Sequence, residues 1–239
     1  MARASRTGAI AAVMLVSAIA GCRAPGLEAG RAVPGHTQAA SVKTGLAVPL
    51  TGTKVSALIP GPRGFTVDPS KSDDSGEQVL TTPTPPGASL HDISCASWWA
   101  GTSYIGPGDV GYAVKEFTRS DGITLTIIVN IYRRGGGTSV FDAAMVLHNR
   151  CTHFTYRDAD GLRYRVDIKP ASQAGLGDRS LTYDATETAG GEVFPTEVTL
   201  IQVGNATIGI NQTGPAASPP VRVVPPLARL IAALRATRY

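Results

Sequence analysis

Apolar and polar residues alternate most clearly between residues 111 and 132. The stretch 111–118 alternates, 119–122 supplies the turn residues Ser-Asp-Gly, and 123–132 is rich in β-branched side chains. This pattern is typical of two antiparallel strands joined by a short turn. It predicts a β-hairpin over 111–132.

Two further hairpins and one more strand follow the same signals. The segment 152–168 turns at Asp160-Gly161, and the segment 196–213 turns at Gly204-Asn205. Between them, 180–187 predicts a strand. The short turns favour antiparallel neighbours over long crossover connections.

Three other segments show helical spacing. A short helix is predicted across 88–99, and a longer one after the glycines 135–137, with Thr138 or Ser139 as its N-cap. The apolar side of the longer helix would carry Val140, Phe141, Ala144, Leu147 and Cys151. After Pro225-Pro226, the leucines and isoleucine at 227, 230, 231 and 234 predict a C-terminal helix.

These elements together predict an α+β domain, a twisted antiparallel sheet packed by a few helices, over residues 54–239. No second linker or internal repeat divides that range. The segments 68–77 and 81–87 are polar and rich in Pro and Gly, and we expect both to be irregular and exposed.

Residues 1–21 have the three parts of an export signal: a basic start, about a dozen apolar residues and a small-residue end. The apolar run is too short to span a membrane as a helix, which needs about 20 residues. Ala18-Ile19-Ala20 fits an ordinary signal-peptidase site. Ile19-Ala20-Gly21-Cys22 instead resembles the bacterial lipobox, which implies cleavage before a lipidated Cys22. We favour the lipoprotein reading, with residues 22–53 as the lipidated cysteine and a flexible tether.

The three cysteines support this interpretation. Exported proteins tend to pair their cysteines, and lipidation of Cys22 leaves Cys95 and Cys151 as a possible disulfide. Free buried thiols at these two positions are the alternative. We therefore expect a protein held on the extracellular face of the cell membrane by its lipid anchor.

Charge argues against a nucleic-acid partner. Arg3 and Arg6 belong to the leader, so the remaining chain carries 20 basic and 18 acidic residues, a balance of +2. The basic residues are also scattered.

Catalytic patterns are missing from the sequence. It contains no HExxH, GxSxG or SxxK motif, no CxxC pair, and no histidine pair with zinc spacing, so we expect neither a catalytic residue nor a metal or cofactor. His91-Asp92, with Ser89 and Ser94, is interpreted as polar residues on a short helix. Asp158-Ala-Asp160-Gly161 lacks the remaining ligands of a calcium loop and is interpreted as a turn.

Two groups of residues could bind a ligand. Trp98, Trp99, Tyr104 and Tyr112 could line a cleft, although packing in the core explains them as well. Arg133, Arg134, Gly136 and Thr138 lie where glycine amides and a helix N-terminus could hold a phosphate or carboxylate, although an ordinary strand-to-helix connection would need the same residues.

Several segments give the chain a resemblance to the PknH-like extracellular domain, which occurs on some actinobacterial receptor kinases and in free-standing lipoproteins. The segments are ALIPGPRGF (57–65), SCASWW (94–99), VNIYRRGGGTSVFDAAMVLHNRCTHF (129–154), VTLIQVGNATIGI (198–210) and the Leu-rich terminal helix. The resemblance implies a twisted antiparallel sheet braced by disulfides around a cleft, and a role in ligand sensing. Family kinases carry two disulfides in this domain, whereas this chain offers cysteines for one.

We therefore expect a non-catalytic sensor or ligand-binding module of the cell envelope, for an unknown small-molecule or lipid ligand. A structural or assembly partner of another envelope protein is the alternative. The third hypothesis is a secreted hydrolase whose catalytic triad is formed by residues from distant segments of the chain.

Overall fold

The computed structural model of the 239-residue chain describes residues 50–77, 93–99, 109–158, 160–172, 175–215 and 225–237. All of them belong to one compact unit, 47–239. The helices are α1 (Gly52–Leu58), α2 (Cys95–Trp99), α3 (Gly136–Arg150) and α4 (Ala228–Ala236). The strands are β1 (Phe65–Asp74), β2 (Asp109–Arg119), β3 (Thr124–Tyr132), β4 (His153–Arg157), β5 (Arg163–Pro170), β6 (Arg179–Ala189), β7 (Glu192–Val203) and β8 (Ala206–Thr213).

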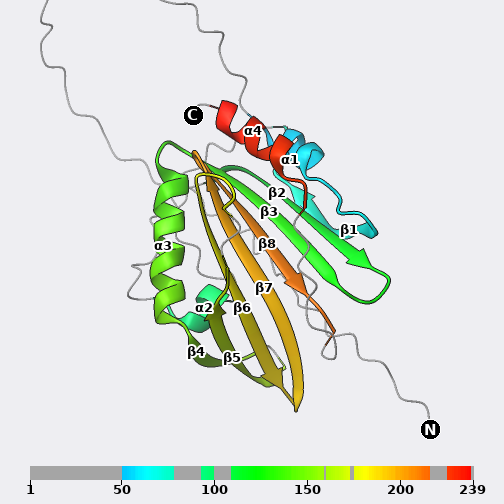
Figure 1. The fold of residues 1–239 in the computed structure, drawn as a ribbon, viewed down its shortest axis with the longest axis vertical. Coiled ribbons are helices and arrows are strands. Elements are labelled where there is room, and N and C mark those ends of the chain that lie inside the picture. The colour runs from blue at the N-terminus through cyan, green and yellow to red at the C-terminus, as the bar shows by residue number, and fades with distance from the viewer. Residues whose placement is uncertain are drawn as a thin grey trace, which may run out of the picture. The chain divides into compact units, whose positions relative to one another are not determined.

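The strands form one antiparallel sheet in the order β1-β2-β3-β8-β7-β6-β5-β4 (Figure 1). Strands β1 to β3 form one half of the sheet. The chain then adds β4 at the opposite edge, and β5 to β8 follow in order towards the middle. β8 closes the sheet by pairing with β3, so that Ile208 lies opposite Val129. The predicted fold class, an antiparallel sheet with a few helices and one disulfide, is confirmed.

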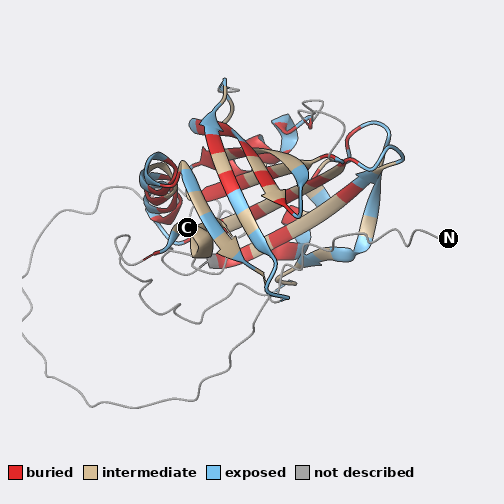
Figure 2. Cartoon of the chain, turned by 90° about the horizontal axis from the view of Figure 1, so that it is seen from below, coloured by how far each residue is buried: buried red, intermediate tan, exposed pale blue. Residues whose placement is uncertain are grey.

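Helices cover opposite faces of the two halves. We call the first face the one that carries Ala113, Val129 and Ile208, which lie in one row across β2, β3 and β8. α1 and α4 pack on this face, where Val55 and Leu230 join the larger core cluster and are fully buried. Alternating bands of buried and less buried residues along the strands follow from this arrangement (Figure 2).

The second face carries Val166, Tyr183 and Leu200 on β5, β6 and β7. α3 packs on it through Phe141, and α2 through its two tryptophans. The edge hairpin β4–β5 therefore presents its second-face residues to α2. In the described part of the chain, no helix packs on its first-face residues.

The disulfide joins α2 to the end of α3. Cys95 is the first residue of α2, Cys151 is the C-cap of α3, and their Cα atoms are 5.4 Å apart. Cys151 is fully buried beside Ile93 and Leu147. The bond fixes the short helix α2, which has only five residues, against the second face.

Several predicted boundaries differ from the structure. β1 includes residues 65–74, so the segment 68–77 is mostly strand; it was missed because its pairing with β2 depends on the partner strand and contains a bulge between Asp68 and Asp73. α1 begins at Gly52, within the range assigned to the tether. α3 begins at Gly136 with Gly135 as its N-cap, not Thr138 or Ser139, because the glycine adopts a φ of 81° that a side chain would disfavour.

Candidate functional site

A buried carboxylate lies on the second face beside α2. Glu187, on β6, is 7% exposed. Its Oε1 accepts a hydrogen bond from the Trp99 indole Nε1 and another from the Tyr156 hydroxyl, the latter at 2.9 Å. The three residues come from α2, β4 and β6, so the cluster exists only in the folded domain.

The strands and the disulfide position these groups. Val166 of β5 pairs with both Phe154 of β4 and Glu187 of β6, so the three side chains form one row across the second face. α2, whose start is fixed by the disulfide at Cys95, brings Trp99 to this row, where it contacts both Phe154 and Glu187.

Aromatic rings surround the carboxylate. Trp99 meets Phe154 edge to face, with 6.3 Å between ring centroids, and Tyr156 stacks on Tyr164 at 4.9 Å with only 8° between their planes. Trp98 continues the group and packs on Tyr183 at 6.2 Å. We call Trp98, Trp99, Phe154, Tyr156, Tyr164 and Glu187 the aromatic–carboxylate cluster.

Burial and nearby carboxylates act on the two tyrosines of the cluster. Burial, followed by the neighbouring Glu187 charge, raises the pKa of Tyr156 well above its usual range. Burial and then Asp158 raise the pKa of Tyr164, to which Glu187 also contributes. Both hydroxyls therefore stay protonated at neutral pH, and Tyr156 remains a hydrogen-bond donor to the carboxylate.

His148, on α3, lies at the other side of Tyr183. Its ring stacks on the tyrosine ring with 4.9 Å between centroids, it is 4% exposed, and its buried Nδ1 has no hydrogen-bond partner. Burial lowers the pKa of His148 because charging the ring inside the protein is costly. Tyr183 is thus held between α2 and α3.

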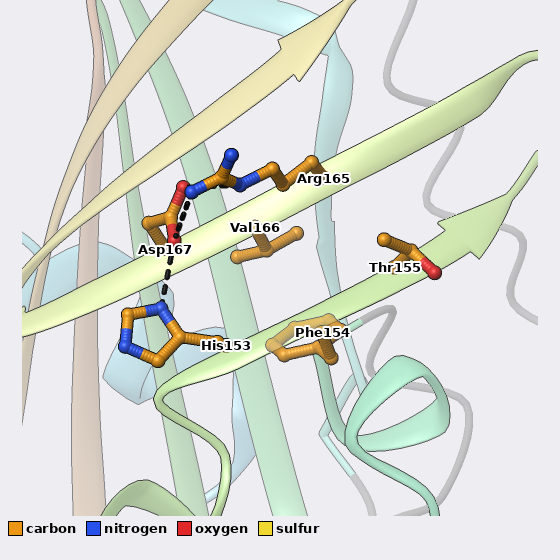
Figure 3. A pocket seen from close by; sticks show the side chains of 6 residues that line it. All are labelled: His153, Phe154, Thr155, Arg165, Val166 and Asp167. Atoms are coloured by element: carbon orange, nitrogen blue, oxygen red, sulfur yellow. Dashed lines mark hydrogen bonds and ion pairs between the residues drawn. The ribbon is translucent and has the colours of Figure 1, made fainter.

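An open hollow of about 380 Å³ lies on the edge hairpin, lined by His153, Phe154, Thr155, Arg165, Val166 and Asp167 (Figure 3). On its first-face side, Asp167 accepts from His153 Nδ1 at 2.7 Å and from Arg165 Nε at 2.9 Å. These two contacts, His153 first, lower the pKa of Asp167. Further along the same face, Arg157 lies directly opposite Arg163.

The His153–Asp167 pair has the geometry of two members of a hydrolase triad. A triad also needs a nucleophile on the other ring nitrogen. Among the described residues, no serine bonds to His153, and Asp167 is shared with Arg165. His91, Asp92 and Ser89, named from the sequence, lie outside the described residues.

The structure brings together two of the four predicted cleft residues. Trp98 and Trp99 lie in the aromatic–carboxylate cluster. Tyr112 lies on β2, which is separated from β6 by three strands, and its hydroxyl donates to Asp73 Oδ2 at 2.9 Å. Tyr104 lies outside the described residues, as does the predicted lipidation site Cys22.

Polar groups at and beside the predicted anion site make hydrogen bonds within the protein. The Gly135 amide donates to Asn205 Oδ1 at 2.9 Å, and the Gly136 amide donates to the Arg133 carbonyl at 2.8 Å. The Thr138 hydroxyl accepts from Gln202 Nε2 at 2.8 Å. The contacts with Asn205 and Gln202 attach the start of α3 to the β7–β8 turn and to the end of β7.

The segment around Asp158 forms a turn between β4 and β5. Asp158 Oδ1 accepts from the Leu162 amide at 2.9 Å, and Gly161 has a φ of 80°. Within the described ranges, no group of three or more acidic, histidine or cysteine side chains could hold a metal ion. No helix in those ranges is long and apolar enough to cross a membrane.

Sequence reasoning missed Glu187 and His148, yet the sequence held a signal for each. In β6, Leu181, Tyr183, Ala185 and Glu187 occupy alternate positions, so a carboxylate falls on the face that is otherwise apolar. His148 follows Phe141 by seven residues and thus shares its face of α3. A charged or polar side chain on a buried face needs a hydrogen-bond partner, and one without such a partner calls for a functional explanation.

Comparisons with known proteins give similarities to solved structures alone. No family model matches the chain, and none of the curated proteins does. The chain is similar in structure to the extracellular domain of PknH from Mycobacterium tuberculosis, with a TM-score of 0.40, 12% identity, and coverage of 78% of this chain and 90% of that one. A putative uncharacterized protein from Mycobacterium smegmatis, an Rv0999 ortholog, has a TM-score of 0.31 and 13% identity over 71% of this chain and 87% of that one. The predicted resemblance to the PknH-like extracellular domain is confirmed as an overall likeness, and no residue role or ligand is taken from it.

Proposed function

We propose that this chain is an extracellular lipoprotein, anchored to the cell membrane through Cys22, whose folded domain is a non-catalytic ligand-binding module. The observation that carries the proposal is the Cys95–Cys151 bond. It uses two of the three cysteines of the chain, and the remaining one stands at the end of the sequence that resembles a lipobox.

An extracellular location fits this chemistry. Disulfides persist in oxidising compartments and are rare in the cytosol. The basic and apolar residues of 1–21 supply an export signal. A diacylglyceryl group and a further acyl chain on Cys22 would give stable anchoring, since one chain alone binds a membrane only marginally.

Ligand binding is supported by the aromatic–carboxylate cluster. Its aromatic rings and its carboxylate are the groups that typically orient a small ligand in a protein pocket. A contiguous exposed apolar patch would favour an assembly role. The large apolar side chains that are exposed in the described chain come instead from four separate parts of it: Val67, Val146, Leu162 and Val193.

Anchoring is tested by detergent phase separation of the protein expressed in a bacterial host that processes lipoproteins. The wild-type chain should enter the detergent phase, and Cys22→Ala should remain in the aqueous phase. The double variant Cys95→Ala/Cys151→Ala is the matched control and should still enter the detergent phase. Wild-type protein in the aqueous phase would overturn the proposal of a lipid anchor at Cys22.

Binding is tested by native mass spectrometry of the wild-type protein extracted from those membranes. A discrete added mass that is lost on denaturation would support a ligand-binding module. A protein that carries only its acyl chains would contradict it.

A further inference from the structure

Glu187 is a buried carboxylate without a cationic partner. Among the described residues, its contacts are the neutral donors Trp99 and Tyr156, and both act on Oε1. No Lys, Arg or His in the described ranges forms an ion pair with it. A carboxylate removed from water is costly unless a charge or hydrogen bonds compensate it, and here the compensation comes from one side only.

The second oxygen remains open. In the described part of the chain, the buried polar atoms that lack a partner are His148 Nδ1 and Gln202 Oε1. Glu187 Oε2 is not one of them and has no partner there, so it reaches the surface. The two donors on Oε1 hold the carboxylate in place and leave Oε2 available to an incoming positive charge.

The surrounding rings favour a positive charge. The face of an aromatic ring is negative, and a cation placed over it gains about 0.5–2 kcal/mol depending on how far it is removed from water. Trp99, Phe154, Tyr156 and Tyr164 all lie in the cluster around the carboxylate. Burial is the main cause of the raised pKa of both tyrosines, and the Glu187 charge adds to it.

The arginines of the β4–β5 hairpin lie on its other face. Strand alternation places Arg157, Arg163 and Arg165 on the first face, whereas Tyr156, Tyr164 and Glu187 lie on the second. These arginines therefore cannot neutralise Glu187 without a change of register, which would turn every side chain of the strand over.

We propose that the aromatic–carboxylate cluster binds the ammonium group of a small organic cation, with the Glu187 carboxylate as its counter-ion and the aromatic rings around it. This inference rests on the proposed function and names the ligand class of its binding site. The same ammonium chemistry occurs in free amines and in lipid headgroups.

The test uses the full chain with Cys22→Ser, labelled with ¹⁵N, and choline as the probe. The sequence has two tryptophans, so the spectrum shows two indole N–H signals, and Trp99→Phe identifies the one that bonds to Glu187. Choline should shift the Trp99 signal in a saturable way with a dissociation constant in the millimolar range. The neutral isostere 3,3-dimethylbutan-1-ol should shift it far less.

Glu187→Gln should weaken choline binding by roughly tenfold or more, because it removes the charge while keeping the shape of the side chain. Asp167→Asn is the matched control: it removes a carboxylate from the first face and should leave choline binding unchanged. Equal shifts from choline and the neutral isostere, or unchanged binding by Glu187→Gln, would overturn the inference. If Glu187→Gln does not fold, the comparison of the two probes on unsubstituted Glu187 decides.

Two further comparisons distinguish a lipid headgroup from a free amine, and the cation site from the membrane anchor. Phosphocholine binding more tightly than choline would point to a lipid headgroup, and weaker binding to a free amine. None of these measurements depends on Cys22, so a failure of the anchor cannot imitate a failure of the cation site. A neutral or anionic ligand found in native mass spectra would keep the proposed function and overturn this inference.

Discussion

The His148 ring lies stacked on Tyr183, with 4.9 Å between ring centroids and 26° between the ring planes, and its buried Nδ1 has no hydrogen-bond partner among the described residues. Burial lowers the pKa of this histidine from its ordinary value of 6.5. Above pH 6.5 the ring is neutral in both the folded and the unfolded protein. Below pH 6.5 the unfolded protein binds a proton that the folded protein resists, so the stability falls as the pH falls.

We therefore predict that the free energy of unfolding decreases on the acidic side of pH 6.5, and that His148→Phe removes most of this decrease. Phenylalanine keeps a ring against Tyr183 and does not titrate. Urea unfolding at a series of pH values measures the effect. His153→Gln, at an exposed position, is the control and should keep the decrease; the same slope in wild type and His148→Phe would refute the assignment.

The disulfide should contribute a large part of the domain's stability. Its cysteines are 56 residues apart, and a closed loop of this length stabilises a protein by about 4 kcal/mol in the chain-entropy description. Reduction of the wild-type protein should lower the urea midpoint accordingly. The variant Cys95→Ala/Cys151→Ala should unfold at a similar midpoint with or without reductant. An unchanged midpoint on reduction of the wild type would speak against a structural role for the bond.

The facing pair Arg157 and Arg163 should be unfavourable. Like charges directly opposite each other in an antiparallel pair repel, so Arg163→Glu should stabilise the protein by about 0.5 kcal/mol, or roughly 1–2 °C in Tm. Arg157→Glu should have a similar effect, and the double variant should lose the gain because it again places like charges together. Differential scanning calorimetry at low and high salt checks this, since salt should reduce each effect. A double variant more stable than both single ones would exclude cross-strand repulsion as the cause.

Gly137 marks the closest approach of α3 to the β7–β8 turn. A Cβ at this position would lie 2.8 Å from the Gly204 carbonyl oxygen and 2.9 Å from the Ala206 amide nitrogen, both backbone atoms. Gly137→Ala should therefore destabilise the domain by about 1–3 kcal/mol. Gly209→Ala is the matched control, because its Cβ would meet nothing nearer than 3.8 Å. Equal Tm values for the two variants would show that α3 can move away from the turn at little cost.

The sequence predicts those parts of the fold that depend on local pattern. The hairpins over 111–132, 152–168 and 196–213 are confirmed, because alternation and glycine turns define a strand pair without reference to distant residues. The C-terminal helix is confirmed for the same reason. β1 has no such pattern: it is an edge strand with mostly exposed residues, and its pairing is determined by β2.

The arrangement of the site depends on contacts between distant residues. Trp99 and Glu187 are 88 positions apart, and β3 meets β8 although more than 70 residues separate them. Local periodicity cannot show which strands become neighbours. The sequence therefore offered the tryptophans as candidate cleft residues together with Tyr112, which is separated from β6 by three strands, and it did not indicate Glu187.

The intact mass of the protein extracted from its bacterial membranes tests the central claim most directly. We predict a chain that begins at Cys22, carries the mass of its acyl chains, and is two hydrogens lighter than the reduced form because Cys95 and Cys151 are bonded. A chain that begins at Gly21 without acyl groups, or one that retains residues 1–21, would contradict the account of a lipid-anchored extracellular module.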